Sequence, residues 1–189
     1  MLNFFKRKPV MQHFYEDVEG WFGDPLDKEL YDEVVEMAQN ESHFVEVGSY
    51  KGKSTCLMAV NIINSGKKIV FDSVDNFSAC PGDEFANNIK PVMDYVNPVK
   101  GDSVEVAKSY KDSSLDFVFI DADHAYESVK NNLHAWFPKL KGAAIFAGHD
   151  YGNPTNGVKQ AVDEFFKNAN FHVEQRKHIW VVNMGQKNR

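Results

Sequence analysis

The chain has 189 residues, of which 43% are hydrophobic, and this is enough for one domain with a sizeable core. Its formal net charge of −6 argues against a general binder of nucleic acid or of acidic membranes, because such proteins need clustered lysines and arginines. The two cysteines do not make a disulfide framework and predict a reduced, cytoplasmic setting, and no run is long and apolar enough to span a membrane.

Residues 1–22 are expected to form a helical arm, and residues 23–189 the main domain. Apolar side chains recur in the arm at roughly helical spacing, which predicts an amphipathic helix packed on the domain. These side chains are Val10, Phe14, Val18, Trp21 and Phe22. The arm could simply cover hydrophobic surface, act as a lid over a substrate site, or mediate a homodimer. Its start carries charges but no apolar stretch of the kind found in secretory signals.

A strand, a glycine turn and a helix follow one another in the first half of the chain. After a helix expected at residues 24–40, the apolar run 43–47 predicts a strand, Gly48 and Gly52 mark a turn, and residues 56–63 predict a helix. Glycines allow the backbone to approach a ligand closely, and the start of a helix offers free N–H donors. The motif is therefore typical of a nucleotide-binding site.

The acid in this motif, Glu46, indicates which nucleotide is bound. A carboxylate at the turn would repel a pyrophosphate, whereas it would attract a ligand that carries an ammonium or sulfonium charge. This contrast favours S-adenosylmethionine (SAM) over a dinucleotide.

Two further strand ends carry polar residues that suit an adenosine ligand. The second strand, residues 68–74, ends at Asp75 and Asn76, where an acid can accept hydrogen bonds from ribose hydroxyls. The same dipeptide also starts turns. A third strand leads to Asp102 and Ser103, which could border the adenine or could simply cap the following helix.

The remaining elements complete an alternating pattern. Residues 84–96 predict a helix broken at a proline, and a strand at 114–121 is followed by a helix at 127–137. A buried strand at 142–147 and a helix at 158–168 come next. Two short strands that we expect to be antiparallel end the pattern, at residues 171–175 and 179–182. The pattern predicts a Rossmann-like, doubly wound α/β fold with three layers (α/β/α), a mostly parallel sheet and an antiparallel C-terminal strand pair.

Acids stand at five of the predicted strand ends, where ligands bind in such sheets. They are Glu46, Asp75, Asp102, Asp121 and Asp150. Asp121 and Asp150 end strands expected to be neighbours, so their carboxylates could together hold Mg²⁺ or a similar cation. His149 could be a third ligand, which would suit Mn²⁺ or Fe²⁺ better.

His124 lies three residues after Asp121, on the turn that opens the next helix. Its ordinary pKa of about 6.5 would leave it largely neutral at pH 7 and able to act as a general base. The alternatives are structural, because Asp121 and Asp123 could cap the helix and His124 could bond to the loop.

Three segments resemble a known family. The sequence EVGSYKGKS at residues 46–54 is similar to the SAM-binding motif of class I methyltransferases, in particular the catechol O-methyltransferase group. The sequences FIDADHAY at 119–126 and AGHDY at 147–151 resemble small bacterial and phage methyltransferases of the same broad group, to which the macrolide-sugar O-methyltransferases also belong.

The resemblance implies a role for each matching position. The cofactor SAM would contact Glu46, Gly48, Ser49, Tyr50, Gly52, Ser54, Asp75, Asn76, Asp102, Ser103 and Asp121. His124 would be the general base and Asp121 and Asp150 metal ligands. Tyr151 stands where catechol-type enzymes have an asparagine ligand, so a third ligand would shift to His149.

We therefore expect SAM-dependent O-methylation of a small-molecule or sugar hydroxyl. A divalent cation could assist this reaction. Two other classes remain open from the sequence. One is a metal-independent methyltransferase that acts on nitrogen or carbon. The other is a binding module that uses the SAM fold without catalysis, or a dinucleotide-dependent oxidoreductase on a related sheet.

Overall fold

A seven-stranded sheet forms the centre of the computed structural model, which describes residues 10–187. The strand order is β3-β2-β1-β4-β5-β7-β6. The strands are β1 (Ser42–Val47), β2 (Ile69–Asp75), β3 (Asn97–Lys100), β4 (Leu115–Ile120), β5 (Leu140–Gly148), β6 (Glu174–Arg176) and β7 (Ile179–Asn183). The first five are parallel, and β7 pairs antiparallel with both β5 and β6.

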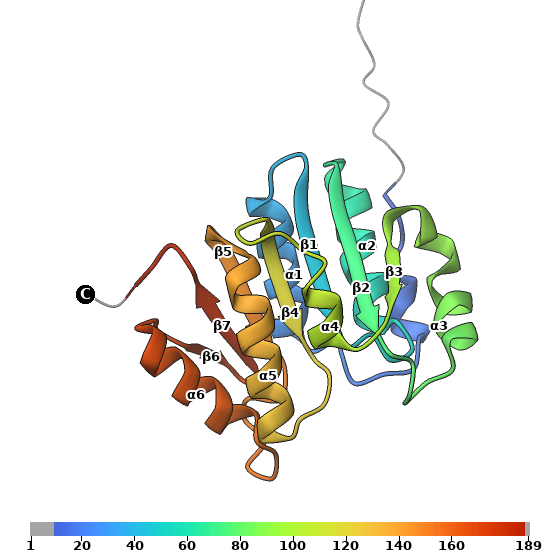
Figure 1. Cartoon of the computed structure of the whole chain (residues 1–189). Coiled ribbons are helices and arrows are strands. Elements are labelled where there is room, and N and C mark those ends of the chain that lie inside the picture. The colour runs from blue at the N-terminus through green and yellow to red at the C-terminus, as the bar shows by residue number, and fades with distance from the viewer. Residues whose placement is uncertain (1–9, 188–189) are drawn as a thin grey trace, which may run out of the picture.

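Helices cover both faces of the sheet. Figure 1 shows α4, α5 and α6 on one face and α1 and α2 on the other, with α3 beside the β3 edge. The helices are α1 (Pro25–Met37), α2 (Lys53–Ser65), α3 (Gly82–Ile89), α4 (Ser103–Ala107), α5 (Tyr126–Trp136) and α6 (Val158–Ala169), with 3₁₀ turns at η1 (Phe14–Asp17), η2 (Lys90–Tyr95) and η3 (Phe137–Lys139). The predicted three-layer, doubly wound fold with an antiparallel C-terminal pair is confirmed. None of the described helices is long and apolar enough to cross a membrane.

The central strands are apolar along nearly their whole length because both of their faces are covered. In β4, Phe117 and Phe119 point into the core under α1 and α2, while Val118 and Ile120 point into the core under α5 and α6. The break predicted at the proline of the 84–96 segment is confirmed, since the chain changes from α3 to the 3₁₀ turn η2 at Lys90, next to Pro91.

The direction of chain winding reverses between β1 and β4, which is where ligands bind in this type of sheet. The strand ends there are joined by the backbone: Asp121 N–H donates to the Val47 carbonyl at 2.7 Å, and His149 N–H donates to the Ile120 carbonyl at 3.1 Å. The ends of β1, β4 and β5 therefore lie at one edge of the sheet.

The helix predicted before residue 23 is wrong for the part that the structure describes, and residues 1–9 of the arm lie outside it. Only the 3₁₀ turn at Phe14–Asp17 forms, and Val10 and Trp21 are exposed instead of joining an apolar stripe. Gly20 and Gly23 have φ values of 155° and 129°, which a right-handed helix excludes. We call residues 10–23 the N-terminal segment.

The N-terminal segment runs along α2. Met11 N–H donates to the Asn64 side chain at 2.8 Å near the end of that helix, and Gly20 lies against Lys53 at its start. An extended chain reaches along a neighbouring helix with fewer residues than a second helix would need. The segment is thus an irregular strip that covers α2.

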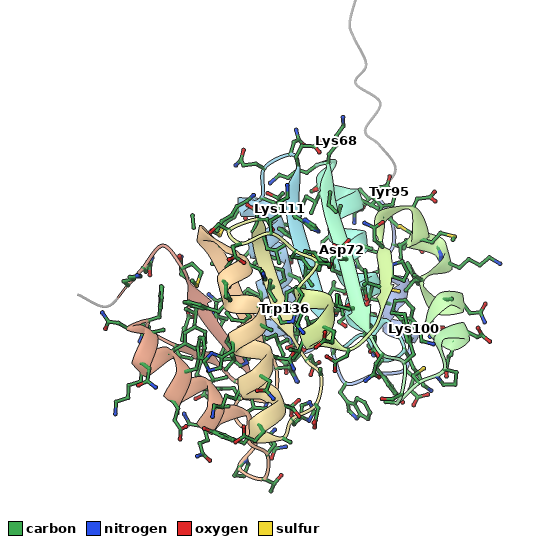
Figure 2. All side chains as sticks on the ribbon, in the orientation of Figure 1. Lys68, Asp72, Tyr95, Lys100, Lys111 and Trp136 are labelled. Atoms are coloured by element: carbon green, nitrogen blue, oxygen red, sulfur yellow. The ribbon has the colours of Figure 1, made fainter. Side chains whose placement is uncertain are left out.

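A buried carboxylate ties together the strands at the β3 side of the sheet. Asp72 on β2 accepts hydrogen bonds from His43 Nε2 and the Tyr110 hydroxyl, both at 2.7 Å, and from Asn97 Nδ2 at 3.0 Å. Figure 2 shows Asp72 on β2. These bonds lower the pKa of Asp72 although its burial acts in the opposite direction.

We predict that Tyr110→Phe lowers the free energy of unfolding by about 2 kcal/mol, because it removes a hydrogen bond to a buried charge while it keeps the ring. Urea denaturation at pH 7 measures the change. Tyr95→Phe is the matched control, since Tyr95 is exposed, and its effect should stay within about 0.5 kcal/mol. Equal effects of the two variants would contradict a stabilising role of Asp72.

Candidate active site

The glycine turn after β1 is pressed against the end of β4. Gly48 has a φ of 92°, and a Cβ atom there would lie 2.0 Å from the Asp121 carbonyl oxygen. Tyr50 and Gly52 also have positive φ values, of 47° and 87°. Gly52 precedes α2 and offers no side chain to cap its first N–H groups, so the start of this helix keeps donors for a ligand.

Asp75 closes this turn from the end of β2. Its Oδ2 atom accepts the N–H groups of Ser49 and Tyr50 at 2.7 and 3.0 Å, and its Oδ1 atom accepts the N–H of Phe77 at 2.6 Å. Since a carboxylate has about four acceptor positions, it keeps capacity for one more donor. Asn76 is exposed and accepts the Ser78 N–H at 2.8 Å, so this dipeptide also makes the turn that its residue types favour.

Glu46 lies deeper than the sequence suggested. It is part of β1, 1% exposed, and faces α2 rather than the turn. Its Oε2 atom accepts the hydroxyl of Thr55 and, at 3.3 Å, that of Ser73. Burial raises the pKa of Glu46 from its ordinary 4.5 to about 7, although hydroxyl donors oppose the change.

This burial predicts a stability that falls with rising pH. Because the folded chain holds the Glu46 proton up to about pH 7 and the unfolded chain releases it near 4.5, unfolding releases a proton between these values. At about 1.4 kcal/mol for each pH unit, this lowers the free energy of unfolding by on the order of 3 kcal/mol from pH 4.5 to 7.

Glu46→Gln should remove this part of the pH dependence, since the amide does not titrate. Urea denaturation of both proteins at pH 5, 6, 7 and 8 gives the difference between their curves, in which the other titrating groups cancel. A constant difference across this range would show that the pKa of Glu46 is ordinary.

The side chains of Asp102 and Ser103 both make hydrogen bonds within the fold. Asp102 is the N-cap of α4 and accepts the N–H groups of Val104 and Glu105 at 3.0 and 3.1 Å. The Ser103 hydroxyl donates to the side chain of Asn132 and accepts the Trp136 indole N–H at 2.9 Å. The capping alternative therefore describes the Asp102 side chain, and a contact with adenine stays a prediction.

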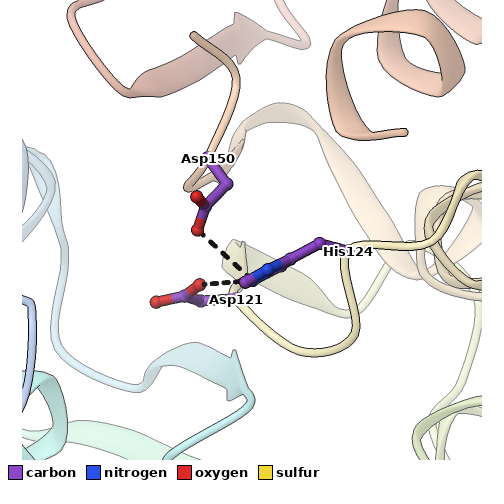
Figure 3. A group of neighbouring side chains, drawn as sticks. All are labelled: Asp121, His124 and Asp150. Atoms are coloured by element: carbon purple, nitrogen blue, oxygen red, sulfur yellow. Dashed lines mark ion pairs between the residues drawn. The ribbon is translucent and has the colours of Figure 1, made fainter. Parts of the chain in front are cut away.

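Two acids and a histidine converge at the ends of β4 and β5. His124 Nε2 lies 3.2 Å from Asp150 Oδ2 and 3.6 Å from Asp121 Oδ1 (Figure 3). Asp123 makes the local bonds that cap the loop, because it accepts the Ala125 N–H at 3.2 Å and the Ser128 hydroxyl at 2.5 Å. Asp121 and Asp150 are half-buried and turn toward the histidine instead. We call Asp121, His124 and Asp150 the acid–histidine group.

These contacts change the acid–base behaviour expected of His124. The hydrogen bond with Asp121 and the neighbouring negative charges raise the pKa of His124 above 6.5, so more of it is protonated at pH 7 than the sequence alone suggested. The hydrogen bond with His149 holds the pKa of Asp150 below its usual value. A cation bound by Asp121 and Asp150 would take the place of the proton on His124 Nε2. It would return His124 to its neutral form.

His149 takes a different place from the one predicted. Its Nδ1 atom is 3.2 Å from Asp150 Oδ2, and its Nε2 atom is 3.7 Å from Asp27 Oδ1. Burial lowers the pKa of His149, but the hydrogen bond with Asp150 and the nearby acids outweigh it, so the pKa is raised. Sequence reasoning missed Asp27, although an acid three residues after Asp24 is the signature of a capping box.

The donor atoms fit a divalent cation with two carboxylates and one imidazole. One ligand atom from each of Asp121, His124 and Asp150 lies within 4.8 Å of the others. Carboxylate oxygens suit Mg²⁺ and Mn²⁺, and the imidazole shifts the preference toward Mn²⁺ or Fe²⁺. His149 is not part of this group, whose third member is His124.

The N-terminal segment borders both halves of this region. The Trp21 ring is 83% exposed and lies 5.2 Å from the Tyr50 ring on the glycine turn. Phe22 next to it is buried, with its ring 6.1 Å from the His149 ring. Lys51 anchors the segment through an ion pair with Glu19 at 2.7 Å. The segment thus lies against both the glycine turn, through Trp21, and His149, through Phe22.

Comparison with known proteins agrees with this geometry. A family model described as a methyltransferase domain matches residues 45–151, which is more than half of the chain and includes both the turn and the acid–histidine group. The chain belongs to this methyltransferase family. It is thus an enzyme of the SAM-dependent methyltransferase class, as the motif at 46–54 predicted. No curated protein sequence matches the chain closely enough to count as a relative.

Solved structures share the fold. The O-methyltransferase NovP has 17% identity and a TM-score of 0.70, covering 86% of this chain and 79% of its own. An O-methyltransferase from Bacillus cereus in complex with SAH has 17% identity and a TM-score of 0.65, covering 90% and 86%. CalS11, a TDP-rhamnose 3′-O-methyltransferase of calicheamicin biosynthesis, has 16% identity and a TM-score of 0.63, covering 85% and 78%.

Proposed function

We propose that this enzyme methylates a hydroxyl group of a small molecule or sugar, with SAM as the donor. The observation that supports the proposal is the close approach of Gly48 to the Asp121 backbone, since it brings the glycine turn next to Asp121, His124 and Asp150. The names of the similar structures support an oxygen acceptor, and that of CalS11 supports a sugar.

The cofactor half of the proposed site is built from the turn and the strand ends around it. The first N–H groups of α2, at Lys53 and Ser54, would bind the SAM carboxylate, and the buried charge of Glu46 would attract its ammonium group from behind the turn. The remaining acceptor capacity of Asp75 suits a ribose hydroxyl. Backbone groups near Asp102 and Ser103 would border the adenine, because their side chains are already bonded.

The reaction needs one proton transfer and one displacement. His124 Nε2 would take the proton from the acceptor hydroxyl, and the oxygen would form a bond to the methyl carbon of SAM. The carbon–sulfur bond breaks and its electron pair stays on sulfur, which gives S-adenosylhomocysteine. The enzyme contributes mainly by holding the two reactants in line and by removing the proton.

A divalent cation at Asp121 and Asp150 would lower the pKa of the acceptor hydroxyl and hold its oxygen. The two carboxylates alone would hold this cation, so that the lone pair of His124 Nε2 stays available for the acceptor proton. Trp21 and Tyr50 would form an aromatic border of the acceptor site, so we propose that the N-terminal segment acts as a lid next to it.

We predict that His124→Ala lowers turnover by about two to four orders of magnitude and leaves SAM binding unchanged. The assay measures S-adenosylhomocysteine release with a panel of TDP-sugars and catechols, and calorimetry measures SAM binding. His172→Ala is the control, because His172 is exposed and outside the acid–histidine group. Normal turnover of His124→Ala would remove its role, and binding of NAD without SAM would overturn the proposed function.

The role of a metal is tested by its removal. We expect EDTA to abolish turnover and Mn²⁺ or Mg²⁺ to restore it, because the acceptor oxygen would lose the cation that positions it. Asp150→Asn should weaken this rescue, while SAM binding stays normal. Full turnover in EDTA would mean that the acids serve His124 alone and that the enzyme is metal-independent.

A further inference from the structure

A line of contacts extends from the acid–histidine group into the interior. Asp150 Oδ2 lies between two imidazoles, 3.2 Å from His124 Nε2 on one side and 3.2 Å from His149 Nδ1 on the other. The opposite nitrogen of His149 faces Asp27 Oδ1 at 3.7 Å. The proposed function uses only the outer part of this line.

Both ring nitrogens of His149 are therefore directed at carboxylates. A neutral imidazole has one lone pair for a metal, so coordination by His149 would require it to give up its contact with either Asp150 or Asp27. Its side chain is only 14% exposed, and the ring of Phe22 packs beside it. Rotation of the ring out of this line would break these contacts.

Asp27 is itself held in place. It is 2% exposed, and its Oδ2 atom accepts the N–H groups of Gly23 and Asp24 at 3.0 and 2.9 Å, in the capping box of α1. This leaves Oδ1 to face His149. The anchor at the inner end of the line is thus set by backbone bonds that do not depend on the ligands.

Asp150 lies at a turn, in a backbone conformation that aspartate tolerates. It has a φ of 62°, in the left-handed region that residues other than glycine, asparagine and aspartate rarely adopt. Its carboxylate follows a strand end that continues into a turn, and its direction depends on the side chains around it. His149, the preceding residue, supplies one of these contacts.

We infer that His149 is a positioning residue, held by Asp27, that fixes the Asp150 carboxylate toward Asp121 and His124, and that it is not itself a metal ligand. The inference rests on the proposed role of Asp150 in the function above. Metal ligands commonly depend on such supporting hydrogen bonds, whose loss weakens metal binding by about 10- to 100-fold.

Two amide variants separate the two contacts. In His149→Asn the amide nitrogen takes the place of Nδ1, so the bond to Asp150 is kept and the contact with Asp27 is lost. In His149→Gln the amide nitrogen takes the place of Nε2, so the contact with Asp27 is kept and the bond to Asp150 is lost. His149→Ala loses both.

Calorimetry with Mn²⁺, in the presence of S-adenosylhomocysteine, measures the effect on the full-length protein. We expect the Ala and Gln variants to bind Mn²⁺ about 10- to 100-fold more weakly and the Asn variant to stay within about threefold of the wild type. An Asn variant as weak as the Ala variant would overturn the inference, because the bond to Asp150 would then not be what supports metal binding. An Ala or Gln variant that binds like the wild type would show that the bond to Asp150 has no role.

Crystal structures of the wild type and the Ala and Asn variants decide the matter if the wild type does not take up Mn²⁺. We then expect the Asp150 carboxylate to turn away from His124 in the Ala variant and to stay in the Asn variant. An unchanged Asp150 in the Ala variant would overturn the inference. Binding of S-adenosylhomocysteine to the wild type tests the proposed function separately.

Discussion

The close packing of the glycine turn on the end of β4 is the constraint on which the site depends. No side chain fits at Gly48, because the Asp121 carbonyl occupies the space that a Cβ atom would need. The strands β1 and β4 are neighbours at the point where the winding of the sheet reverses, so this contact follows from the topology. It brings the glycine turn and Asp121, the two parts of the proposed site, together through backbone contact alone.

The sequence predicted the backbone of this arrangement well. Apolar runs with glycine turns located the strands, and acids at their ends located the site at one edge of the sheet. Side-chain partners could not be predicted in the same way, because they depend on segments that are distant in the chain. His149 and Asp27 are 122 positions apart in the numbering, and only the fold shows that they face each other. The prediction of a helix near Phe14 was wrong because the spacing of apolar residues gives no information on glycines that adopt positive φ values.

Several polar side chains of the proposed site have a structural role that is compatible with the proposed one. Asp75 bonds the backbone of the turn, and Asp102 caps α4, so each is oriented before any ligand arrives. A side chain that is already fixed loses little conformational entropy when it binds. The structural and functional interpretations of these residues, which are alternatives in the sequence, are therefore compatible in the folded protein.

The burial of Glu46 has a consequence for the cofactor that its charge alone does not suggest. Burial raises the pKa of this carboxyl to about 7, so it holds a proton more readily than an exposed glutamate does. A cationic ligand nearby would favour the ionised form and offset part of the cost of burial. Because a pyrophosphate would oppose the same ionisation, a buried acid in this place would favour SAM over a dinucleotide. The contrast inferred from the sequence stays a prediction, with burial rather than position at the turn as its physical basis.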